Sequence, residues 1–284
     1  MKAIPCRQNQ DLQKQIEAYA VALKAQAHSI GDHGLDEQEF YASGLFRGAI
    51  EKIRGEFSAT MIDKRSFVKA VLDYLQDLGA IAEWHSSGEK NRHDYTVLHS
   101  SGKTTAIELK GCLDGNNTNI FERPAQAHEF ILWSICPSAS SDPEKNVWSG
   151  LHTRLSSEII ESQTVVDGLV VWDWICGTVA RPCPKLSAGS ARANIGPYKL
   201  VPPCIYLFPD TVPSVRNNPA PQPQAMREDS LLGILHSVFK GSTKEINAVS
   251  FEVEYRGSDL ARRTSIERNG QQMRKSAFTP IRRK

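Results

Sequence analysis

The first eighty residues carry apolar side chains at the spacing of helices. Residues 9–29 are rich in helix-forming side chains, and residues 36–59 and 63–79 repeat apolar side chains every three or four positions. At the start of the last stretch Asp63 stands where a helix N-cap is expected, and Gly79 stands where that helix should end. The pattern therefore predicts helices over these three stretches.

The pattern then changes to the two-residue period that is typical of strands. Residues 80–84, 94–98 and 104–109 are short stretches of this kind. The last two are separated by the polar residues "HSSGK", 99–103, which include a glycine suited to a turn. The sequence therefore predicts a meander of short strands with a hairpin at its end.

The rest of the chain mixes both patterns. Apolar side chains recur at helical spacing in three further segments, which we expect to be helices: residues 125–136, 149–162 and 229–241. Three others are apolar throughout or alternate as strands do: residues 165–177, 204–208 and 248–257. Prolines crowd residues 209–224, which we expect to form a loop.

This order of helices and strands predicts an α/β fold, with a mixed central β-sheet flanked by helices. We expect an N-terminal helical extension over residues 1–35 and a main domain over residues 36–240. Residues 241–284 are expected to add a C-terminal strand segment and a basic tail to the same domain. A chain of 284 residues that is 40% hydrophobic is long enough to bury a full core.

Positive charge is concentrated at the C-terminal end of the sequence. The net charge of the chain is +2, but residues 257–284 alone are net +6, which leaves the remainder near −4. Such a concentration of charge favours contact with a polyanion. A solvated, unstructured end is the alternative interpretation.

Targeting and redox signals are absent from the sequence. The first residues hold no apolar run of the length of a signal peptide, and nowhere are there 18 consecutive apolar residues. The six cysteines are scattered without the paired spacing of a zinc site or a small disulfide scaffold. We therefore expect a soluble, cytoplasmic protein with reduced thiols and no membrane contact.

Charged residues on the predicted hairpin are candidates for a catalytic site. Alternation along the second strand places Glu108 and Lys110 on one side, and the turn brings Asp94 back toward them. Two converging carboxylates suit a hard cation such as Mg²⁺, and a nearby ammonium can orient or deprotonate a water molecule. The alternative is a solvated hairpin face held by weak salt bridges.

This arrangement resembles the PD-(D/E)XK nuclease superfamily, the restriction-endonuclease-like fold. The resemblance implies that Asp94 and Glu108 are the two metal-binding acids and that Lys110 is the motif lysine, although His93 replaces the family's proline. It also implies a glutamate on the preceding helix, for which Glu51 is the first candidate and Glu56 the second.

The loop after Lys110 looks like the segment that approaches DNA in several type II restriction enzymes. Its side chains suited to base or phosphate contacts are Asn116, Asn117, Asn119 and Arg123. Asparagines and glycines are also ordinary turn formers, so a purely structural loop is the alternative.

The resemblance leads us to expect a magnesium-dependent type II restriction endonuclease that cuts double-stranded DNA as a homodimer. Two alternatives stay open, namely a repair or defence nuclease of the same fold without sequence-specific cleavage, and a non-catalytic DNA-binding protein. The residues "QAHEF", 126–130, are similar to the helix motif of RecB-type repair nucleases, with Phe130 in place of a tyrosine. This similarity favours the first alternative.

Overall fold

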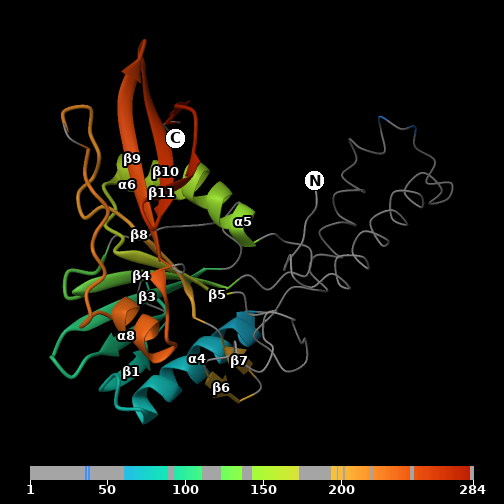
Figure 1. The fold of residues 1–284 in the computed structure, drawn as a ribbon, viewed down its shortest axis with the longest axis vertical. Coiled ribbons are helices and arrows are strands. Elements are labelled where there is room, and N and C mark those ends of the chain that lie inside the picture. Colours follow the sequence, from blue (N-terminus) through green and yellow to red (C-terminus); the bar gives the residue numbers. More distant parts are fainter. Residues whose placement is uncertain are drawn as a thin grey trace.

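The part of the chain that the structure describes is built on one mixed β-sheet (Figure 1). The structure is a computed structural model. It describes residues 36, 38, 61–88, 93–110, 123–135, 143–172, 193–196, 198–200, 202–217, 220–243 and 246–281.

Ten strands of the described residues form this sheet. Their order is β1-β2-β3-β4-β5-β8-β9-β10-β11, with β12 beside β10. The strands are β1 (Glu83–Ser86), β2 (Tyr95–Leu98), β3 (Thr104–Lys110), β4 (Glu129–Ile135), β5 (Gly168–Trp172), β8 (Cys204–Leu207), β9 (Ile246–Arg256), β10 (Asp259–Arg268), β11 (Gln271–Lys275) and β12 (Thr279–Pro280). A separate hairpin consists of β6 (Ala193–Ile195) and β7 (Tyr198–Leu200).

The sheet combines parallel and antiparallel pairing. Strands β1, β2 and β3 form an antiparallel meander, whereas β3, β4 and β5 run parallel to one another. Beyond them β8 is antiparallel to β5 and parallel to β9, and β9 to β12 are antiparallel. This confirms the predicted α/β class with a mixed central sheet. Residues 246–281 belong to the same sheet, while the domain boundaries proposed at residues 35 and 240 stay predictions.

Helices cover the two faces of the sheet with separate apolar cores. The first core packs α4 (Met61–Asp77) and α8 (Leu231–Val238) against one face. The second core packs α5 (Pro143–Gly150), the π-helical turn η1 (Leu151–Leu155) and α6 (Ser156–Ser162) against the other face. None of the described helices is long and apolar enough to cross a membrane.

The central strands are buried on both sides. In β3, Ile107 and Leu109 belong to the first core, whereas Ala106 belongs to the second. A strand covered on both faces needs apolar residues at successive positions, as parallel strands between helix layers usually have. This burial also determines the environment of every polar side chain on β3.

Helix α4 confirms the prediction for residues 63–79. Its end is a Schellman motif in which Gly79 has φ +68°, Gly79 N donates to Gln76 O (2.8 Å) and Ala80 N donates to Leu75 O (2.9 Å). Asp63 lies inside α4, so its assignment as the N-cap was wrong.

The predicted helix over residues 125–136 is wrong, because the apolar part of this segment is β4. All seven residues from Glu129 to Ile135 are buried, since β4 lies between β3 and β5 with a core on each face. A short apolar run has no clear period, so its sequence does not distinguish a buried strand from a buried helix. The helix required for the similarity of residues 126–130 to RecB-type nucleases is therefore not formed.

Other predicted segments match the described structure. Predicted strands over 165–177 and 204–208 correspond to β5 and β8, and the predicted helix over 229–241 corresponds to α8. The predicted helices over 9–29 and most of 36–59 lie outside the described residues.

The basic C-terminal segment is not an unstructured tail as far as Ile281. Strands β10, β11 and β12 occupy most of residues 259–280 and pair with one another and with β9. Its first arginine, Arg262, is 4% exposed. Residues 282–284 lie outside the described part of the chain.

Arg262 ties β10 to the helical layer through the π-helical turn. Its Nε donates to Ser156 Oγ (2.6 Å), and its Nη2 donates to His152 O (2.6 Å) and Thr153 O (3.1 Å). Its Nη1 donates to Pro280 O (3.1 Å). Burial lowers the pKa of the Arg262 guanidinium. Arg262 therefore serves the fold and is not available to a polyanion at the surface.

We predict that Arg262→Leu lowers the free energy of unfolding by about 3 kcal/mol or more, because it leaves the buried Ser156 hydroxyl and three part-buried carbonyl groups without this donor. Arg256→Ala is the matched control, since Arg256 is an exposed arginine of the same hairpin and pairs with Glu254. Its loss should cost about 1 kcal/mol or less. Urea denaturation of both variants measures the difference, and equal losses would contradict the structural role of Arg262.

Candidate functional site

The candidate site is carried by the predicted hairpin of β2 and β3. These strands pair in antiparallel register from Tyr95 opposite Ile107 to Leu98 opposite Thr104. Tyr95 lies in the first core with Ile107, as the predicted alternation requires. The turn closes through Gly102, which has φ +78° and donates from its N–H to His99 O. The hairpin prediction is thus confirmed.

Asp94 lies directly beside Glu108. The backbone N–H of Asp94 donates to Ile107 O (2.9 Å), and the Asp94 Oδ2 atom accepts a hydrogen bond from Leu109 N (2.8 Å). These two bonds contact the residues on either side of Glu108 in β3. The hairpin therefore brings both candidate acids together and fixes the orientation of the Asp94 carboxylate.

Glu108 and Lys110 form a buried ion pair. Lys110 Nζ donates to Glu108 Oε1 over 2.6 Å, and the two residues are 9% and 8% exposed. In the neighbouring strand β4, Leu132 lies opposite Glu108 and Ser134 lies opposite Lys110. Leu132 belongs to the second core. This burial does not fit the alternative of a solvated hairpin face.

Burial raises the pKa of the Glu108 carboxyl group, and the negative charge of Asp94 raises it further. The hydrogen bond and the positive charge of Lys110 act against this rise in pKa. A divalent cation bound beside Glu108 would oppose the effects of burial and of Asp94 on this carboxyl group, as Lys110 does.

The carboxylate oxygens of Asp94 and Glu108 suit Mg²⁺. Mg²⁺ prefers oxygen ligands and is usually bound by one or two carboxylates together with water and substrate phosphates. Asp94 and Glu108 supply two such side chains. Within the described ranges, no group of three or more His, Cys, Asp or Glu residues is arranged to hold a metal ion.

Arg123 lies against Asp167 at the start of β5. Its Nη1 is 3.2 Å from Asp167 Oδ2, which also accepts a hydrogen bond from Phe130 N (2.6 Å). This ion pair connects Arg123 to the central strands, and its predicted contact with DNA stays a prediction. The other predicted site residues lie outside the described part of the chain: Glu51, Glu56, Asn116, Asn117 and Asn119.

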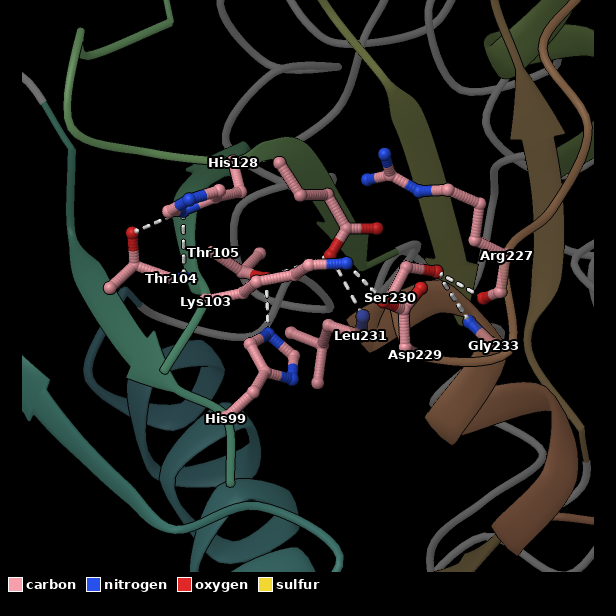
Figure 2. A network of polar contacts seen from close by, with 11 residues as sticks. His99, Lys103, Thr104, Thr105, His128, Arg227, Asp229, Ser230, Leu231 and Gly233 are labelled. Carbon is pink, nitrogen blue, oxygen red and sulfur yellow. Dashed lines mark hydrogen bonds and ion pairs between the residues drawn. The ribbon is translucent and has the colours of Figure 1, made fainter. Parts of the chain in front are cut away.

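A second polar cluster lies around Thr105 at the other end of β3, where Figure 2 shows His99 and Leu231 nearby. Glu129 is 3% exposed, and its Oε2 atom accepts hydrogen bonds from Thr105 Oγ1 (2.7 Å) and Leu231 N (2.8 Å). Leu231 begins α8, and the N-cap Ser230 accepts a bond from Gly233 N. The buried carboxylate thus satisfies an amide at the N-terminus of α8, where negative charge is favourable.

Hydrogen bonds link His99, Thr105 and Glu129 in a chain, as a base, a hydroxyl nucleophile and an acid are linked in some hydrolases. These three residues do not form a catalytic site of that kind. Thr105 is 1% exposed and donates its hydroxyl proton to Glu129, so it accepts the bond from His99 Nε2 (2.7 Å). At the surface an ion pair joins Lys103 to Asp229. These contacts hold α8 against the hairpin, and sequence reasoning missed them because Leu231 is 102 residues from Glu129.

Comparison with known proteins adds no further assignment. No protein-family model matches the chain, and neither a curated protein nor a solved structure matches it.

We predict that Glu129→Gln changes how stability depends on pH. Burial raises the pKa of Glu129, so the folded protein binds this proton more readily than the unfolded chain. The stabilising contribution is then complete below the ordinary value of 4.5 and is lost as the pH rises through the raised pKa. The free energy of unfolding of the variant should therefore increase relative to the original protein as the pH rises.

Chemical denaturation of both proteins from about pH 4 to pH 8 checks this prediction. Glu228→Gln is the control for the loss of one negative charge, because Glu228 is exposed and lies shortly before α8. A difference between Glu129→Gln and the original protein that does not vary with pH would contradict the prediction.

Proposed function

We propose that the protein is a magnesium-dependent endonuclease that hydrolyses phosphodiester bonds of double-stranded DNA. The observation that carries this proposal is the buried Lys110–Glu108 ion pair with the Asp94 carboxylate beside it. The antiparallel meander of β1, β2 and β3 on one side of a mixed α/β sheet supports the resemblance to the restriction-endonuclease-like fold. A sequence-specific homodimer of the type II restriction class is the form of this function that we favour.

Asp94 and Glu108 would hold the magnesium ion in this proposal. When bound, the ion would stabilise negative charge on the phosphate and make a bound water molecule more acidic. The backbone amide of Leu109 keeps Asp94 Oδ2 oriented toward β3. Lys110 favours the ionised form of Glu108 at a site where burial opposes it.

Lys110 would also orient the attacking water molecule. Its ammonium group lies on the same side of β3 as Glu108, held by the 2.6 Å contact. A cation in this position also offsets charge that develops on the oxygen atoms during hydrolysis. The burial of the pair limits solvent access and strengthens both effects.

We predict that the intact protein cuts plasmid DNA with magnesium and that a chelator stops the reaction. Asp94→Asn and Glu108→Gln should each lower the cleavage rate by about a thousandfold, because each removes several kcal/mol of charge stabilisation. Glu254→Gln is the matched control, since Glu254 is paired with Arg256 on the C-terminal hairpin. Gel analysis of the products measures the rates.

The form of the products distinguishes the candidate functions. Discrete fragments support a sequence-specific enzyme, whereas a smear supports a repair or defence nuclease of the same fold. Cutting that a chelator does not affect would reject the magnesium mechanism. DNA binding without any cutting would support the non-catalytic alternative.

We predict that Lys110→Met abolishes cutting but preserves DNA binding, because phosphate contacts elsewhere dominate affinity. Magnesium binding should also weaken, since the substitution leaves Glu108 buried without its cation and so disfavours its ionised form. Gel-shift assays and magnesium calorimetry measure these two effects separately. Full cleavage by Lys110→Met would exclude Lys110 from the reaction.

A further inference from the structure

Arg65 places a positive charge beside Asp94, on the solvent-exposed side of the candidate site. It stands on α4, its side chain is 57% exposed, and its Nη2 atom lies 3.8 Å from Asp94 Oδ1. The other oxygen of Asp94, Oδ2, is bound to Leu109 N. Asp94 thus has one oxygen fixed to the sheet and the other facing the guanidinium group.

The Arg65 contact is too weak to be what positions Asp94. A distance of 3.8 Å exceeds the length of a hydrogen bond, and an exposed ion pair of this kind is worth about 1 kcal/mol or less. The bond from Leu109 N already orients Asp94. No hydrogen bond from the Arg65 guanidinium is formed within the described ranges, so its donors can reach a ligand.

The backbone of α4 holds Arg65 in place. Phe67 and Val68, two and three positions later in the helix, are fully buried in the first core. The guanidinium group therefore extends from a helix anchored in the core to a point 3.8 Å from Asp94 Oδ1.

We propose that Arg65 binds a backbone phosphate of the nucleic acid next to the Asp94–Glu108 pair. This inference rests on the proposed function, and it names a residue that the catalytic motif does not contain. A phosphate that approaches two carboxylates is repelled unless a cation lies beside them. The planar guanidinium group offers five N–H donors in a geometry that matches phosphate oxygens.

Arg65 and Lys110 would then have different roles. Lys110 is buried and bound to Glu108, so it acts on the inner side of the site. Arg65 is exposed and faces the other acid, so it meets a phosphate that arrives from solvent. Lys110 favours the ionised form of Glu108, and Arg65 binds the substrate backbone.

The test compares the binding of a fluorescent, mixed-sequence DNA duplex to four proteins, with chelator present to prevent cleavage. The proteins are the original chain, Arg65→Ala, Arg65→Lys and Arg216→Ala. Arg216 is the matched control, because it is an exposed arginine in the proline-rich loop and forms no ion pair within the described residues. Anisotropy titrations at several salt concentrations give the affinity and its salt dependence.

Arg65→Ala should bind DNA about tenfold more weakly, a change of about 1.4 kcal/mol. The slope of log affinity against log salt should fall by about one, as expected for the loss of one phosphate contact. Arg65→Lys should be intermediate, because lysine keeps the charge but not the two-pronged geometry. In cleavage assays with magnesium, KM should rise for Arg65→Ala while kcat changes little.

Several results would overturn this inference. If the original protein cuts DNA and Arg65→Ala binds with unchanged affinity and salt slope, Arg65 has no phosphate contact and the proposed function stands. Equal losses in Arg65→Ala and Arg216→Ala would show general charge attraction only, which also rejects the inference. If the original protein neither binds nor cuts duplex DNA, the proposed function fails and this inference fails with it.

Discussion

Burial of β3 on both faces requires each of its polar side chains to find a partner inside the protein. Apolar cores cover the two sides of the strand, and unpaired polar groups there would cost several kcal/mol each. Thr105 meets this requirement by donating to Glu129, and Glu108 meets it by pairing with Lys110. The polar clusters at the two ends of β3 therefore both arise because this strand cannot expose its sides to solvent.

The polar side chains at the two ends of β3 have different kinds of partners. At the Thr105 end the partners are the amides of α8 and a surface ion pair, and together they join the hairpin to a helix. At the Glu108 end the neighbours are another carboxylate and the exposed guanidinium of Arg65. The first arrangement has fixed protein partners for its carboxylate, whereas the second brings two acids and two cations together near solvent. This difference is why we propose a catalytic role for only one of the two ends.

Local signals in the sequence predicted the hairpin and α4, because alternation, a turn glycine and a helix-ending glycine each act over a few residues. Gly79 and Gly102 both adopt the positive φ that such positions need. The position of Asp94 beside Glu108 could be predicted from the geometry of the hairpin. The role of Glu129 could not be predicted, because its partner lies on α8 and the apolar run around it has no clear period. The same holds for Arg262, whose carbonyl partners at residues 152 and 153 lie more than a hundred positions earlier.

The structure also changes the interpretation of the basic C-terminal segment. Arg262 is buried, and Arg263 and Lys275 share the carboxylate of Glu252. Arg263 and Arg256 also lie over the ring of Phe278, so these cations stabilise the hairpin as well as carrying charge. Charge that is paired within the fold exerts less attraction on a distant polyanion, since the field of each pair decays faster than that of an isolated cation. Under the proposed function, attraction of a phosphate backbone to the candidate site would then depend more on cations beside the carboxylates than on the total charge of this segment.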